Sequence, residues 1–143
     1  MAAYLNDLGI NCSLGNSKAS VLDAIANSDQ SEPEWLTLST DLEISGNPVW
    51  VGQVNTELPS LSAFEHCLDS RNNQLALSAY QQIAASVKRL SEGIDNTRIA
   101  VVIGTSTSGI REGERARRQL LNDDKMPEHY HYATQEMTAP ADF

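Results

Sequence analysis

The residues whose types could do chemistry are concentrated in one loop, Gly104–Gly109, with the sequence Gly-Thr-Ser-Thr-Ser-Gly. Hydroxyl groups in such a loop can hydrogen-bond a ligand, and glycines allow a ligand or another backbone segment to approach closely. The loop follows Ile99–Ile103, a mostly β-branched run without polar alternation, which predicts a strand buried on both faces. Functional sites gather at the ends of such strands, so we expect a binding loop here.

The loop does not fit the known phosphate-binding motifs. A P-loop requires Lys followed by Ser or Thr at the start of the helix, whereas Ile110 and Arg111 follow this loop. The dinucleotide-binding pattern G-x-G-x-x-G also fails, because position 106 is serine. Two interpretations stay open: a structural turn in which Thr107 or Ser108 lies near the helix cap, and a loop that binds a small ligand in an α/β domain.

The histidines are candidates for metal binding or acid-base chemistry. His129 and His131 are two residues apart, which on a strand would place both on one face. Only Glu128 is close to them in sequence as a further ligand, and a metal site needs more carboxylate or thiolate groups. We therefore expect structural roles for these two histidines and for His66, and no bound metal.

Charge and targeting signals restrict the class of protein. The formal net charge of −9 opposes a general attraction to nucleic acid or to an anionic membrane. The first ten residues lack a basic stretch followed by an apolar core, and no apolar run approaches the roughly 20 residues of a membrane span. Cys12 and Cys67 fit neither a disulfide-rich pattern nor zinc spacing, so we expect reduced, packed thiols in a cytoplasmic protein.

Apolar periodicity predicts strands that alternate with helices. The expected strands are Ala2–Leu8, Val49–Val54 and Ile99–Ile103. The expected helices are Ser17–Ala26, a long helix with an apolar stripe from Leu75 to Leu90, and Ile110–Leu121. The polar segment Ser28–Asn47 is predicted to be an excursion with at most short strands. The 143 residues are enough for one domain, or for half of a double one.

Three stretches, in this order, resemble the N-terminal half of a β-ketoacyl-acyl carrier protein synthase: Tyr4–Ser17, Ser70–Ala79 and Arg98–Gly109. Members of this family begin with a strand, a glycine and a Leu-Gly pair, which Gly9, Leu14 and Gly15 reproduce. Their long helix begins with an arginine and Gln-Leu-Ala, which Arg71 and Gln74–Ala76 echo. The resemblance implies an α/β fold: the first half of a thiolase-like αβαβα architecture, with a mixed sheet covered by helices.

The resemblance also implies the chemistry of the parent enzyme. In this family a cysteine accepts an acyl group as a thioester, and two histidines assist the decarboxylation of a malonyl thioester, in fatty acid or polyketide synthesis. These residues lie downstream of the point matched by Met137–Phe143, so we expect residues 1–143 to be a truncated N-terminal portion that contains no catalytic residue and is inactive by itself. The missing C-terminal half and a second copy in a homodimer are the expected partners, and Ile99–Ile103 would be left bare without them.

In similar synthases the corresponding glycine-rich loop borders the acyl pocket, and its fourth residue gates chain length. The resemblance therefore implies substrate-binding roles for Thr105, Ser106, Thr107 and Ser108. Thr107 occupies the gating position, and Ser106 and Ser108 replace the usual glycines.

The basic residues after the loop suit an acidic partner. Arg111, Arg115 and Arg118 are expected to dock an acyl carrier protein, which brings its own phosphopantetheine arm, so the chain is expected to need no cofactor. The competing interpretation of these residues and of Arg117 is a solvated helix face. A non-catalytic acyl-carrier-binding or assembly module derived from a synthase is the main functional alternative.

Overall fold

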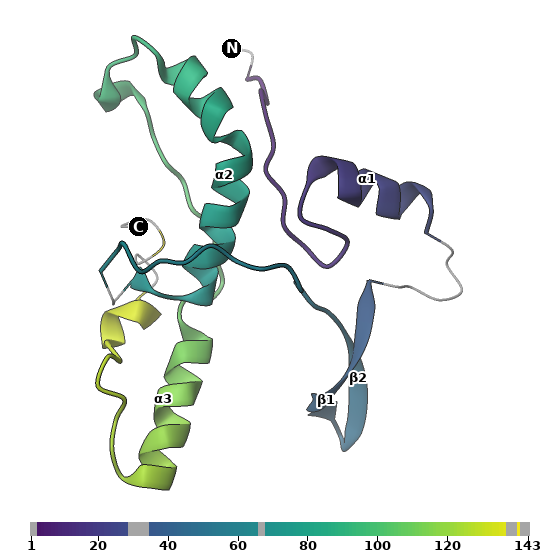
Figure 1. Cartoon of the computed structure of the whole chain (residues 1–143), viewed down its shortest axis with the longest axis vertical. Helices are drawn as coiled ribbons and strands as arrows, with labels where there is room; N and C mark the ends of the chain where they lie inside the picture. Colours follow the sequence, from purple (N-terminus) through teal and green to yellow (C-terminus); the bar gives the residue numbers. More distant parts are fainter. Residues whose placement is uncertain (1–2, 29–34, 66–67, 137–139, 141–143) are drawn as a thin grey trace. The chain divides into compact units, whose positions relative to one another are not determined.

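A computed structural model describes residues 3–28, 35–65, 68–136 and 140 (Figure 1). The helices are α1 (Lys18–Ala26), α2 (Arg71–Ser91) and α3 (Ile110–Asp123), with short 3-10 helices η2 (Asn96–Arg98) and η3 (Tyr132–Gln135). The strands are β1 (Leu36–Ile44) and β2 (Asn47–Gly52). No helix among the described residues is long and apolar enough to cross a membrane.

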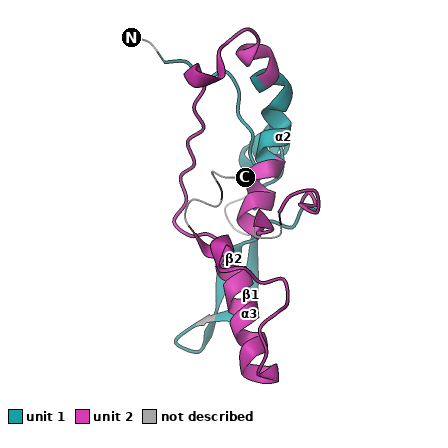
Figure 2. Ribbon diagram, turned by 90° about the vertical axis from the view of Figure 1, so that its left-hand side faces the viewer, with its two compact units in different colours: residues 1–57, 79–87 teal, residues 58–78, 88–143 magenta. Residues whose placement is uncertain are grey.

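The chain divides into two compact units (Figure 2). Unit 1 comprises Met1–Glu57 and Ala79–Val87, and unit 2 comprises Leu58–Ser78 and Lys88–Phe143. Helix α2 contributes residues to both units. Each unit is small, and the described residues bury only three hydrophobic side chains: Val21, Leu61 and Ala116.

The sheet of unit 1 is an antiparallel hairpin of β1 and β2. Its two-residue turn is formed by Ser45 and Gly46, which have φ values of 55° and 77°, as the favoured hairpin turns require. The prediction of at most short strands in Ser28–Asn47 was wrong, because this turn pairs a nine-residue β1 with β2. The predicted strand Val49–Val54 is present, but it begins and ends two residues earlier.

Helix α1 begins where the sequence predicts it. The Ser17 hydroxyl accepts a hydrogen bond from the Ser20 amide at 3.1 Å, and the Ser20 hydroxyl accepts one from the Ser17 amide at 3.1 Å. This reciprocal capping satisfies two amides that a helix start would otherwise leave without partners. Local sequence is therefore sufficient to fix the start of α1.

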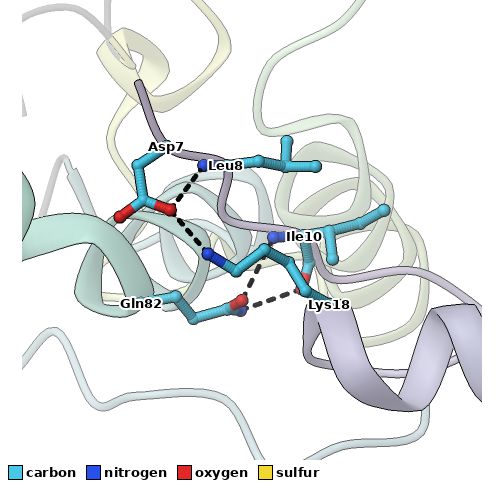
Figure 3. Close-up of polar contacts among 5 residues, drawn as sticks. All are labelled: Asp7, Leu8, Ile10, Lys18 and Gln82. Atoms are coloured by element: carbon cyan, nitrogen blue, oxygen red, sulfur yellow. Dashed lines mark hydrogen bonds and ion pairs between the residues drawn. The ribbon is translucent and has the colours of Figure 1, made fainter. Parts of the chain in front are cut away.

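The N-terminal segment of unit 1 is held by side chains rather than by a sheet (Figure 3). The Gln82 amide of α2 donates to the Ile10 carbonyl at 2.8 Å and accepts from the Ile10 amide at 3.2 Å. The Lys18 ammonium donates to the Asp7 carboxylate at 2.6 Å. The predicted strand Ala2–Leu8 was wrong for its described residues 3–8, which form no strand. Gln82 instead occupies both backbone groups of Ile10, as a neighbouring strand would.

We expect the ion pair between Asp7 and Lys18 to be sensitive to acid. The Lys18 ammonium, then the Ser86 hydroxyl and the Leu8 amide, hold the pKa of the Asp7 carboxyl well below its usual value of 3.8. A lowered pKa stabilises the fold above the unfolded-state pKa, and this contribution is lost as the pH falls below about 4. The Leu8 amide resonance should therefore move with acidification, and Asp7→Asn should abolish that movement. Asp95→Asn, in unit 2, is the control and should leave the pH dependence of the Leu8 amide resonance unchanged. If Asp7→Asn also showed the wild-type pH dependence, the titration at Leu8 could not be assigned to Asp7.

Helix α2 begins at a buried cap in unit 2. The Ser70 hydroxyl, whose residue is 2% exposed, accepts from the Asn73 amide at 3.2 Å. The Asn73 side chain is fully buried and donates to the Leu68 carbonyl at 2.8 Å. The predicted long helix is confirmed, and this cap extends it to Arg71, ahead of the apolar stripe. Gly93, with a φ of 73°, follows its end, where a left-handed glycine commonly terminates a helix.

The predicted buried strand Ile99–Ile103 was wrong for this chain. These residues form no strand, and Val101 and Val102 are 76% and 89% exposed. No described segment pairs with their backbone, and a strand needs a hydrogen-bonded neighbour and a covering layer to be buried. The central mixed sheet implied by the resemblance is therefore not formed by the described residues, whose sheet is the β1–β2 hairpin. An exposed β-branched segment of this kind favours association with other chains.

We expect a charge at Val102 to reduce self-association. Val102→Lys places an ammonium in the exposed apolar segment and, because the side chain is 89% exposed, should leave the helix content unchanged. Sedimentation velocity should show a larger monomer fraction, although the variant is less negatively charged than the wild type and its copies repel one another less. Leu121→Lys, at a 75% exposed position of α3, is the matched control and should have a smaller effect. Equal effects of the two substitutions would argue against association through Ile99–Ile103.

Candidate functional site

Unit 2 contains a cavity of about 320 Å³ between α3 and the segment that leads into η3. Its buried surface includes Ala116 and Thr134, which are 1% and 4% exposed. The polar side chains that line it are Asp69, Glu112, Arg115, Gln119, His129, Tyr130 and His131. A second hollow, of about 510 Å³, lies in unit 1 and is lined by residues of β1 and by the end of β2. Among the described residues, no charged side chain lines it. The chemistry is therefore concentrated in the cavity of unit 2.

Two glycines let α3 pack closely against η3. A Cβ on Gly109 would lie 2.2 Å from the Thr134 carbonyl oxygen. A Cβ on Gly113 would lie 1.6 Å from the side-chain nitrogen (Nε2) of Gln135. The buried Ser108 hydroxyl adds a hydrogen bond to the Thr134 carbonyl at 3.1 Å. This contact fixes the residues of η3 beside the cavity.

Side-chain hydrogen bonds also orient the aromatic groups of the cavity. The Gln135 amide donates to the Tyr130 hydroxyl at 2.9 Å, which leaves the tyrosine proton to be donated elsewhere. The His131 Nδ1 accepts from the Ala133 amide at 3.2 Å, so the neutral ring carries its proton on Nε2. Both groups therefore offer hydrogen-bond donors in defined positions.

The loop before α3 is tied down by its own hydroxyl groups and by α2. The Thr105 hydroxyl donates to the Thr107 carbonyl at 2.6 Å, and the Asn72 amide donates to that same carbonyl. The Arg71 amide donates to the Glu112 carboxylate at 3.2 Å, which links the start of α2 to α3. Ser106 and Thr107 are exposed, whereas Thr105 is half-buried.

The cap of α3 is a glycine that directly follows the two residues expected near the cap. Gly109, with a φ of 54°, is the N-cap, and no side chain accepts a hydrogen bond there. Thr107 and Ser108 lie next to this cap, as the structural-turn interpretation expects, but the Ser108 hydroxyl donates to the Thr134 carbonyl and does not cap the helix. The glycine permits the left-handed backbone that this sharp start requires.

The structure separates the predicted site residues. None of Thr105–Ser108 lines the cavity, so their acyl-binding role stays a prediction. Arg111, Arg115 and Arg118 are all exposed on α3, and Arg115 also lines the cavity. The sequence analysis assigned no site role to the other lining residues, which are Asp69, Glu112, Ala116, Gln119, Pro127, Tyr130 and Thr134. Gly109 and Gly113 are four residues apart at the start of the predicted helix, a spacing that indicates close packing on one helix face. This signal could have located the surface of α3 that packs against η3.

The histidines and the cysteine that the structure describes form no metal site. His129 and His131 both line the cavity, but no group of three His, Cys, Asp or Glu residues in the described part of the chain could hold a metal ion. Cys12 is half-buried, and its amide and carbonyl pair with Gly15 at 2.9 and 3.1 Å. The expectations for His66 and Cys67 concern positions outside the described residues.

Comparison with solved structures gives a relationship that covers nearly the whole chain. The chain is similar to a protein in the structure of a ketosynthase (ApeO) in complex with its chain length factor (ApeC) from Xenorhabdus doucetiae. The two are 28% identical, the TM-score is 0.81, and the match covers 97% of this chain. The chain has a ketosynthase-type fold. It spans 35% of the length of that neighbour.

The comparison confirms the predicted relationship at the level of the ketosynthase fold and leaves the particular kind of synthase open. No known protein-family profile matches the chain. No curated protein sequence matches it either.

Proposed function

We propose that this chain is the N-terminal portion of a β-ketoacyl-acyl carrier protein synthase. The observation that supports the proposal is the similarity to the ketosynthase complex over 97% of the chain, at a TM-score of 0.81. The order of the sequence motifs around Gly9, Arg71 and Gly104 agrees with it. The substrates of the parent enzyme are an acyl thioester and a malonyl thioester, both on carrier proteins.

The proposed reaction is a decarboxylative Claisen condensation. A cysteine thiolate of the parent enzyme attacks the acyl thioester, and the carrier thiol leaves. The malonyl thioester loses carbon dioxide, and the resulting carbanion attacks the carbonyl carbon of the acyl-cysteine. A carbon-carbon bond forms, the bond from that carbon to the cysteine sulfur breaks, and the β-ketoacyl carrier is released. The cysteine and the two assisting histidines are supplied by residues beyond Phe143.

This chain contributes a wall of the acyl pocket in the proposal. The wall is the loop Thr105–Ser108, which the resemblance assigns to that pocket. Two hydrogen bonds to the Thr107 carbonyl, from Thr105 and Asn72, hold the loop in one conformation. A fixed wall suits a pocket that selects acyl chains by length, because close packing penalises a chain that overfills it.

Partner recognition follows from charge and from the exposed apolar segment. Arg111, Arg115 and Arg118 lie three and four residues apart and so share one face of α3, where they attract an acidic acyl carrier protein. The segment Ile99–Ile103 pairs with strands of a second synthase-related polypeptide or of the remaining parent enzyme. The structural neighbour was solved with its chain length factor, which supports a partner of this kind.

A condensation assay with the full coding product tests the proposal. The chain alone, mixed with malonyl and acyl carriers, should give no β-ketoacyl carrier, whereas the complete polypeptide encoded by its gene should give it. Mass spectrometry of the carrier detects the condensed product. Product formation by the chain alone would refute the assignment of the nucleophile to residues beyond Phe143. No product from the complete polypeptide, with intact carriers, would refute the synthase itself.

The second candidate is a non-catalytic assembly module. The presence of a chain length factor in the neighbouring structure favours it, because this is a partner subunit of a ketosynthase. The coding sequence beyond Phe143 distinguishes the two candidates. A cysteine in a turn of small residues, followed by two spaced histidines, supports the synthase, whereas a stop codon directly after Phe143 supports the module.

A further inference from the structure

We propose that the cavity of unit 2 binds a small hydroxy-substituted organic acid, whose carboxylate is held by Arg115. Arg115 lines the cavity, and its guanidinium makes no ion pair with any described residue. A guanidinium offers planar paired donors that match the two oxygens of a carboxylate. This site lies outside the proposed acyl-pocket loop, because none of Thr105–Ser108 lines it, and it shares only Arg115 with the proposed carrier-docking face.

Two further lining residues carry donors, and hydrogen bonds to their side chains fix their orientation. The Tyr130 hydroxyl oxygen accepts from the Gln135 side chain, so its O–H can donate to a ligand, and the neutral His131 ring carries its proton on Nε2 because Nδ1 accepts from the Ala133 amide. The close approach of Gly113 to Gln135 and of Gly109 to Thr134 holds this segment in place. Little conformational entropy is therefore lost when these donors bind an anion.

The acidic residues of the cavity select among anions. Glu112 already accepts a hydrogen bond from the Arg71 amide, and Asp69 is exposed at the lining. Two carboxylates repel any anion in the cavity, whereas a hydroxyl group of the ligand can donate to one of them and so offset part of this repulsion. The volume of about 320 Å³ is at the lower end of small-molecule pockets, which suits a compact metabolite.

The ligand class is tested with malate as the probe. The imidazole resonances of His129 and His131 are followed by NMR in the full chain, in a buffer without carboxylate or phosphate, at fixed pH. We expect saturable shifts with malate and weaker binding of succinate, which lacks the hydroxyl group. Shifts that stay linear to high malate concentration would overturn the proposal, and equally tight binding of inorganic phosphate would overturn its choice of an organic acid.

Matched variants locate the binding. Arg115→Gln should weaken malate binding at least about tenfold, because it removes a charge-assisted pair. Tyr130→Phe should weaken it about threefold while keeping the ring, so the proposal does not depend on a variant that loses its fold. Arg117→Gln, on the same helix but outside the cavity lining, should leave the affinity unchanged. Unchanged affinity in both Arg115→Gln and Tyr130→Phe would refute the site.

Discussion

Replacing Gly9 with alanine is expected to destabilise unit 1 by about 3 kcal/mol, near the upper limit for overpacking. A Cβ at this position would lie 2.0 Å from the Ala79 carbonyl oxygen and 2.8 Å from its carbonyl carbon, both backbone atoms of α2. A backbone atom cannot rotate away as a side chain can, so the N-terminal segment must separate from the helix. The separation would break the two hydrogen bonds between Ile10 and Gln82, which lie next to the clash.

The measurement is the free energy of unfolding in urea, followed by circular dichroism, together with amide exchange at Ile10. Gly104→Ala is the matched control because open space surrounds its Cβ position and its φ lies outside the left-handed range. This control should change the stability by less than about 0.5 kcal/mol. A Gly9→Ala protein with wild-type protection of Ile10 would show that the segment does not depend on this close approach.

The helices could be predicted because their signals are local. Ser17 and Ser70 cap α1 and α2 through hydroxyl groups that accept from the amide three residues later. The start of α3 at Ile110 was also predicted, although its cap is the backbone of Gly109 rather than a hydroxyl group. Periodicity and capping therefore specify where each helix begins, whatever surrounds it.

The strands could not be predicted in the same way because a strand depends on its neighbour. The β-branched run Ile99–Ile103 has the composition of a buried strand, but no described segment pairs with it. The opposite happened at Leu36–Ile44, where alternating apolar residues were overlooked and a full strand forms because the Ser45–Gly46 turn brings Asn47–Gly52 alongside. Without its neighbours a segment shows only a preference for a strand.

The candidate site was partly visible in sequence. The basic face of α3 was predicted, since Arg111, Arg115 and Arg118 have helical spacing. The cavity was not, because Asp69 lies more than forty positions before Glu112 and meets it only through packing. His131 was assigned a structural role, and its cap on Ala133 agrees with that role, but it also lines the cavity. Tertiary packing thus brings these side chains into one cavity, which their positions in the sequence do not predict.

Replacing Gly109 with alanine is expected to destabilise unit 2 by about 3 to 4 kcal/mol through two separate effects. Its φ of 54° lies in the left-handed region, which costs an ordinary residue about 1 kcal/mol. Its Cβ would also lie 2.2 Å from the Thr134 carbonyl oxygen and 2.7 Å from the carbonyl carbon. Relief of this clash requires α3 to move away from η3 and breaks the hydrogen bond from Ser108 to Thr134.

A control separates the two effects, because Gly93 has a φ of 73° but open space at its Cβ position. Gly93→Ala should therefore cost only the backbone term of about 1 kcal/mol, and the difference between the two variants measures the contact between α3 and η3. The imidazole resonances of His131 should shift in Gly109→Ala and stay unchanged in Gly93→Ala. Equal losses of stability in the two variants would mean that the packing against Thr134 contributes nothing, and the cavity would then lack the rigid wall on which its donors depend.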